Sequence, residues 1–166
     1  MNENLSVKRL LDEKLIRAIE LYNSTNYLSR VNSSGRFILL MSSIECLISQ
    51  KENDQEIINI IQEAQEKIKN LNLEKEVIDS VTGSLTFMKS ESIKRSGKQL
   101  VLDLFSDSQE KFNDLNPVDF FSKAYDLRSK LVHEGKVETK VLKIENAQMQ
   151  EFAISCLKKY YDKYYS

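Results

Sequence analysis

Apolar residues recur at steps of three and four along most of this chain, a spacing typical of amphipathic helices. The first stripe predicts a helix over about residues 6–23, and it consists of Leu10, Leu11, Leu15, Ile19 and Tyr22. The next patterns predict helices over about residues 28–49 or 33–49, 54–70, 73–89 and 90–104. Asp54 is expected to cap the helix over residues 54–70. Gly83 weakens the middle of the helix over residues 73–89.

Two more helices are expected in the C-terminal part. Asn116 and Pro117 form a typical helix start, and Gly135 stands where a left-handed C-terminal cap belongs. They bound a helix of about residues 117–134, whose expected core face is Phe120, Phe121, Ala124, Leu127, Leu131 and Val132. The last helix covers about residues 146–164. Residues 107–116 are expected to be a loop, and 137–144 alternate too weakly to predict a sheet. The fold class is therefore all-α, a bundle of six to seven helices.

Composition fits this expectation. The chain has 166 residues, of which 41% are hydrophobic and 30% charged, as in an ordinary globular domain. One proline and four glycines leave few places for tight turns. We expect a single domain over residues 1–166 in the cytoplasm, with no membrane span. Cys46 and Cys156 are expected to be buried thiols, and with one histidine they make no recognisable zinc site.

The net charge of −1 gives no overall electrostatic signature of nucleic-acid binding, so RNA would need a local basic patch. One candidate cluster lies at residues 94–98. The other is at residues 158–165, where lysines alternate with tyrosines that could stack on bases. A solvated helix face with tyrosines covering the bundle edge is the interpretation we favour for the second cluster.

Glu45 is unusual because it lies within the strongly apolar segment 37–48. An isolated buried carboxylate is very unfavourable, so this side chain must pair or reach water. Arg128 and Arg36 are the candidate partners. Such a pair would orient the guanidinium, and it could also support a functional site.

The segment 124–135 contains the only histidine, His133, five residues after Arg128. An imidazole titrates near neutral pH, and a guanidinium can hold a phosphate through two hydrogen bonds. With the 2′-hydroxyl of RNA as nucleophile, these groups could cleave RNA without a metal. The structural alternative is that a histidine in the last turn simply complements the helix dipole and the free carbonyls.

Residues five apart on a helix point about 140° apart, so Arg128 and His133 do not share a face. They could converge if the last turn loosened near Gly135, or if a second protomer completed the site. One histidine per chain supplies both acid and base only in a dimer. Ser129, His133 and Asp126 share a face and suggest a hydrolase triad, but no nucleophile elbow accompanies them.

The segment Tyr125–Gly135 resembles the signature of HEPN domains, in which histidine follows arginine by four to six residues, and is most similar to the Apea-like branch. The segments 43–47 and 92–93 are also similar to that branch. The resemblance implies a helical bundle, often dimeric, with two motifs facing each other. Active members are metal-independent endoribonucleases of toxin–antitoxin, phage-defence and RNA-processing systems, and inactive members bind RNA or protein. Ser129 departs from the Asn, Asp or His that follows the arginine in many active members.

Two hypotheses follow. In the first, a homodimer cuts RNA without cofactor or metal, with Arg128 and His133 as catalytic residues. Its supporting residues are Ser129, Asp126, Glu45 and Tyr125. In the second, the chain is a catalytically inactive module that binds RNA or a partner protein such as an antitoxin.

Overall fold

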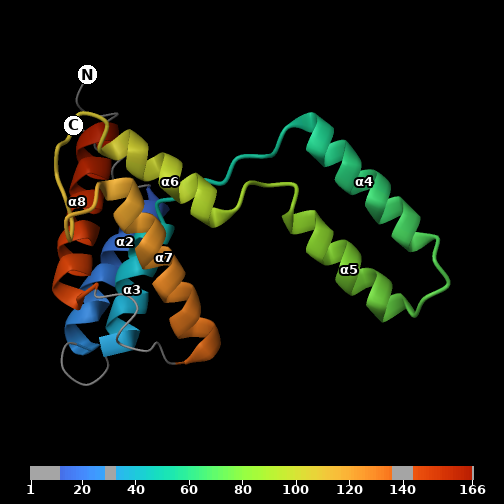
Figure 1. Ribbon diagram of the computed structural model, residues 1–166, viewed down its shortest axis with the longest axis horizontal. Helices are drawn as coiled ribbons and strands as arrows, with labels where there is room; N and C mark the ends of the chain where they lie inside the picture. Colours follow the sequence, from blue (N-terminus) through green and yellow to red (C-terminus); the bar gives the residue numbers. More distant parts are fainter. Residues whose placement is uncertain (1–11, 29–32, 136–143, 166) are drawn as a thin grey trace. The chain divides into compact units, whose positions relative to one another are not determined.

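The computed structural model describes residues 12–28, 33–135 and 144–165. Within these ranges the protein is helical, with two isolated β-bridges and no strand, which confirms the all-α prediction (Figure 1). The α-helices are α2 (Glu13–Ser24), α3 (Ser33–Glu45), α4 (Gln55–Lys69), α5 (Lys75–Phe87), α6 (Ile93–Leu104), α7 (Pro117–Glu134) and α8 (Asn146–Tyr165). A short 3-10 helix, Thr25–Leu28, follows α2.

The helix that carries the motif has the predicted boundaries. The side chain of Asn116 accepts a hydrogen bond from the backbone N–H of Asp119 at 2.9 Å, and Pro117 occupies the first turn. Gly135 follows Glu134 with φ of 69°, the left-handed conformation that suits glycine. Local signals were sufficient here because both caps are formed by residues next to the helix end.

Other helix ends differ from the prediction by a few residues. The second predicted helix stops at Glu45 instead of residue 49, because the N–H groups of Leu47 and Ile48 bond three residues back and tighten the chain into turns. Asp54 occupies the N-cap position of α4, but its side chain makes no capping hydrogen bond. Residues 6–11 and 137–143, for which we made predictions, lie outside the described ranges.

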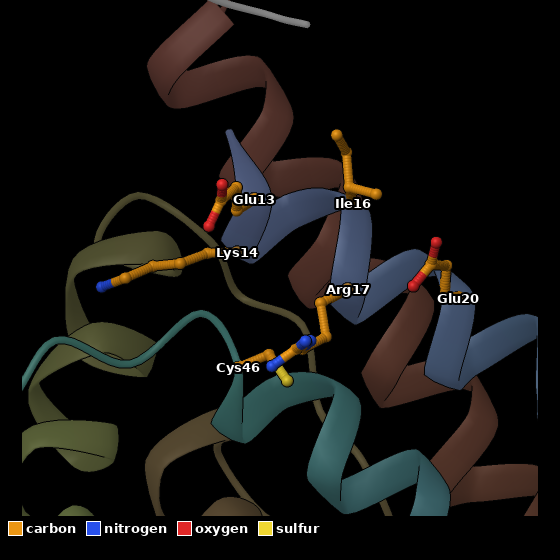
Figure 2. Close-up of a pocket in the computed structure, with 6 residues that line it drawn as sticks. All are labelled: Glu13, Lys14, Ile16, Arg17, Glu20 and Cys46. Atoms are coloured by element: carbon orange, nitrogen blue, oxygen red, sulfur yellow. The ribbon is translucent and has the colours of Figure 1, made fainter. Parts of the chain in front are cut away.

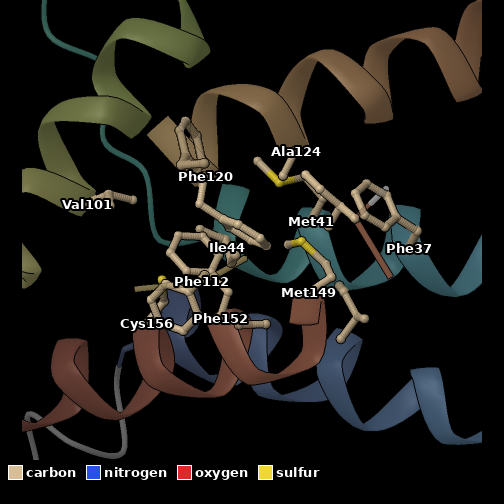
Figure 3. Close-up of a cluster of buried hydrophobic side chains, with 14 of the residues drawn as sticks. Phe37, Met41, Ile44, Val101, Phe112, Phe120, Ala124, Met149, Phe152 and Cys156 are labelled. Carbon is tan, nitrogen blue, oxygen red and sulfur yellow. The ribbon is translucent and has the colours of Figure 1, made fainter. Parts of the chain in front are cut away.

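The described residues divide into two compact units, one formed by the chain up to Ile48 and from Gly97 onward, the other by Ser49–Ser96. The first unit holds the main core, in which Phe105, Phe112, Phe120 and Phe152 pack ring against ring. Figure 3 shows Phe112, Phe120 and Phe152. The ring centroids of Phe152 lie 4.8 Å from Phe120 and 4.9 Å from Phe112. Phe112 comes from the predicted loop, and its burial makes that loop part of the core.

The core face of α7 matches the prediction except at its end. Phe120, Phe121 and Ala124 are fully buried, but Val132 is 47% exposed. Leu131 packs against the core, and the next residue points about 100° away. Val132 was therefore assigned wrongly to the core face.

The second unit is an antiparallel pair of helices, α4 and α5 (Figure 1). The base of the pair is closed by backbone hydrogen bonds from Asn53 to Lys89 and from Glu91 to Lys51, both 2.8 Å long. Further along, the side chain of Gln65 donates to the carbonyl of Thr82 at 2.8 Å. The prediction of a single domain stays a prediction.

Removing the N-cap of α7 should weaken the helix that carries the motif. We expect Asn116→Ala to lower the free energy of unfolding by about 1 kcal/mol, because the N–H of Asp119 would lose its acceptor. Denaturant unfolding followed by circular dichroism would measure this. Asn116→Ser, which retains a capping oxygen, should lose much less, and equal losses in both variants would contradict a capping role.

Candidate functional site

Arg128 and Glu45 form an ion pair between two helices of the first unit. Glu45 is the last residue of α3, Arg128 lies in the second half of α7, and their closest nitrogen and oxygen atoms are 3.3 Å apart. The side chain of Arg128 is 27% exposed and that of Glu45 is 16% exposed. The structure thus provides the partner that the sequence required for Glu45.

The hydrogen-bonding capacity of this pair is only partly used. Oε1 of Glu45 and Nε of Arg128 are buried and make no hydrogen bond with any residue that the structure describes. Burial raises the pKa of the Glu45 carboxyl above its ordinary value of 4.5, and the positive charge of Arg128 offsets this only in part. The contact therefore orients the guanidinium, while its Nε–H stays without a partner among the described residues.

The raised pKa of Glu45 predicts a pH dependence of stability. A group whose pKa is higher in the folded state contributes stability that is complete below the unfolded pKa and is lost as pH rises through the folded pKa. Over the pH range above the ordinary value of 4.5, the free energy of unfolding of the wild type should therefore fall relative to that of Glu45→Gln. Denaturant titrations of both proteins across this range would measure the difference, and parallel pH profiles would contradict the prediction.

Arg36, the other candidate partner of Glu45, is engaged elsewhere. Its Nη2 donates to Oε1 of Gln150 at 2.5 Å, and the amide nitrogen of Gln150 donates to the hydroxyl of Tyr22 at 3.2 Å. This chain of hydrogen bonds joins α3, α8 and α2. Arg36 is nine residues from Glu45 on the same helix, which places the two side chains about 180° apart, whereas Arg128 comes from a helix far away along the chain.

His133 is exposed in the last turn of α7. The helix stays α-helical through Glu134, so the last turn does not loosen before Gly135. Arg128 and His133 consequently keep the angular separation of about 140° expected on a regular helix. The arginine is held toward α3, and the described part of one chain does not bring the two motif residues onto one face.

The remaining predicted site residues lie along the same helix. Ser129 is half-buried and Asp126 is exposed. Tyr125 is partly buried, and its ring lies 6.1 Å from that of Phe121, measured between centroids. Tyr125 therefore contributes to packing.

An open pocket lies between α2 and the end of α3, a place that the sequence did not indicate (Figure 2). It has a volume of about 560 Å³ and is lined by Glu13, Lys14, Ile16, Arg17, Glu20 and Cys46. Burial raises the pKa of the Cys46 thiol, although Arg17 opposes the shift. Five of these residues belong to one helix and Cys46 follows another, and nothing in the local sequence indicates that the two segments meet.

Two lysines near the C-terminal end of α8 contact other residues of the protein. Nζ of Lys159 lies 3.0 Å from a carboxylate oxygen of Glu110, and Lys163 donates to the carbonyl of Asp103 at 3.2 Å. Tyr165 is buried. These contacts support the interpretation of this segment as a bundle edge.

No group of three or more metal-ligating side chains occurs within the described ranges. In the same ranges, no helix combines the length and apolar character needed to cross a membrane. The chain matches no family model, and comparisons with curated proteins and with solved structures find no match either.

Proposed function

We propose that this protein is a metal-independent endoribonuclease of the HEPN type. The observation that carries the proposal is the placement of its two motif residues on one well-capped helix. His133 is exposed in the last turn of α7, and Arg128, one and a half turns earlier, is oriented by Glu45 while about a quarter of its side chain remains accessible. The resemblance of segment 125–135 to HEPN domains supports the same assignment.

The chemistry requires two chains. The imidazole of one His133 removes the proton from a 2′-hydroxyl, and the oxygen attacks the adjacent phosphorus. The bond from phosphorus to the 5′-oxygen then breaks, and the protonated His133 of the second chain donates a proton to that oxygen. Arg128 stabilises the negative charge on the non-bridging oxygens, and the hydroxyl of Ser129 either donates to the phosphate or bonds back to a carbonyl of its own helix. The products are a 2′,3′-cyclic phosphate and a free 5′-hydroxyl.

The test is cleavage of mixed single-stranded and transfer RNA in the presence of a chelator. We expect wild-type protein to cut, and His133→Ala and Arg128→Ala each to lose activity by about 10²-fold or more. Lys130→Ala, an exposed change on the same helix, is the matched control and should retain activity. Unchanged cleavage by His133→Ala would overturn the proposal.

A second function is favoured by a different observation. Arg128 is already paired with Glu45 and does not share a face with His133, as expected for a catalytically inactive module that binds RNA or a partner protein such as an antitoxin. That module would bind RNA or protein without cutting any strand. In both cases we place the protein in the cytoplasm, in a defence or toxin–antitoxin setting.

A further inference from the structure

The second unit leaves much of its apolar surface uncovered. Among its larger hydrophobic side chains only Ile61 is buried, whereas Ile60, Val77, Val81 and Met88 are 61%, 44%, 40% and 58% exposed. A helical unit of this size does not usually bury enough apolar surface to be stable by itself. These exposed side chains are therefore available for a further surface to cover.

On α4, the exposed Ile57 and Ile60 form one narrow stripe together with the half-buried Ala64. Ile57, Ile60 and Ala64 lie within about 60° of one another around the helix axis. Ile61 and Gln65 mark the direction of α5, because Ile61 is buried and Gln65 bonds to Thr82. The stripe is rotated about 90° from that direction, so α5 does not cover it.

α5 carries an equivalent stripe. Val77, Val81, Ser84 and Met88 also lie within about 60° of one another and about 90° from the direction of α4, in the same rotational sense. In an antiparallel pair, the same rotation, viewed from each helix's own N-terminus, leads to the same side. The two stripes therefore form a single continuous face, which we call the hairpin face.

We infer that the hairpin face binds the hairpin face of a second copy of this chain, so that the two pairs of helices form a four-helix bundle. A two-fold axis parallel to the helices would place each α4 against the α5 of the other chain. Crossing angles and distances would then be those of ordinary antiparallel bundles. The proposed nuclease also needs two chains; here the hairpin face is the contact that joins them, and sedimentation tests that contact without an RNA substrate.

The shapes of the two stripes fit each other. The hydrogen bonds from Asn53 to Lys89 and from Gln65 to Thr82 fix which residues of α4 and α5 are level. Ile60 is level with Ser84, and Ala64 with Val81. In the dimer each small side chain would thus face a large one from the other chain, an arrangement that favours interdigitation.

The charges fit as well. Lys67 flanks the stripe of α4 and Glu76 flanks that of α5, on opposite outer edges of one hairpin but at similar levels. The two-fold axis brings Lys67 of one chain beside Glu76 of the other, twice per dimer. The hairpin face itself contains no carboxylate, so no like charges would be buried.

The size of the face sets the expected affinity. It is about 22 Å long, because α4 has 15 residues that rise 1.5 Å each, and about 20 Å wide for two adjacent helices. Two such faces in contact bury on the order of 1,000 Å², at the low end for specific interfaces. We therefore expect a micromolar dissociation constant.

The test is sedimentation equilibrium of the full chain over about 1–100 µM, spanning the expected dissociation constant. Wild type should pass from monomer to dimer. Ile60→Lys and Val81→Lys should remain monomeric, and Ile154→Lys, which changes a similarly exposed residue of α8, should dimerise like wild type. A wild type that is monomeric throughout would overturn the inference, as would dimers that survive both hairpin-face substitutions.

Charge exchange provides a second test that folding defects cannot imitate. Lys67→Glu and Glu76→Lys should each weaken the homodimer by about tenfold, since symmetry duplicates every repulsive contact. Mixing the two variants should restore association to near the wild-type level, because each chain then supplies the charge that the other lacks. Failure of the mixture to associate more tightly than either variant alone would contradict the arrangement.

Discussion

Replacing Phe152 by alanine should lower the free energy of unfolding by about 3–5 kcal/mol. The ring is fully buried and touches three other rings, those of Phe105, Phe112 and Phe120. These three come from the end of α6, from the loop before α7 and from α7 itself. Truncation would leave a cavity with contributions from all three segments, and collapse of any one of them would disturb the others.

Denaturant unfolding monitored by circular dichroism would measure this loss. Phe87→Ala is the matched control, because Phe87 is 83% exposed and its removal creates no cavity. Its effect should stay within about 0.5 kcal/mol. A loss below about 1.5 kcal/mol for Phe152→Ala would show that the aromatic cluster does not organise the core as described.

Gly97→Ala should be destabilising by about 1–3 kcal/mol, although alanine is the better helix former. A Cβ atom at this position would lie 2.2 Å from Cζ of Phe121 and 2.9 Å from Cδ1 of Ile48. Phe121 is fully buried, so its ring has no space into which to move. Overpacking therefore outweighs the gain of up to about 1 kcal/mol in helix propensity.

Gly83→Ala is the same substitution at a position where the added Cβ atom would touch no neighbouring atom. A Cβ at Gly83 meets nothing within 4 Å, and the residue lies inside α5. We expect this variant to be stabilised by about 0.5–1 kcal/mol, the ordinary propensity difference. Thermal unfolding of both variants should show shifts of opposite sign, and shifts of the same sign would contradict the close packing at Gly97.

The Glu45–Arg128 pair connects stability with the proposed function. A guanidinium that is fixed in direction binds a phosphate with less loss of side-chain freedom than a mobile one. The same ion pair also places the carboxylate of Glu45, which would compete with a phosphate for the guanidinium, next to the phosphate site. Glu45 therefore acts as a positioning residue in the proposed nuclease, and as a purely structural partner in the proposed binding module.

The sequence by itself determined the helices and their order. The period of apolar residues located the helices of the described ranges to within a few residues, except that α2 begins at Glu13, capped by Asp12, and not at residue 6. The caps at Asn116 and Gly135 fixed the limits of α7. It also showed that Glu45 needed a partner. These features depend on side chains within one or two turns of each other, so local physical chemistry is sufficient to predict them.

Only the tertiary structure decided which surfaces meet. In the structure Glu45 pairs with Arg128, while Arg36 bonds to Gln150. Phe112, which belongs to a polar segment of the sequence, is buried in the core. The tertiary structure also left the apolar face of α4 and α5 exposed, although both helices show the pattern of core elements. The apolar pattern of a helix predicts which of its faces is buried. It does not predict which segment covers that face, because the covering segment lies far away along the chain.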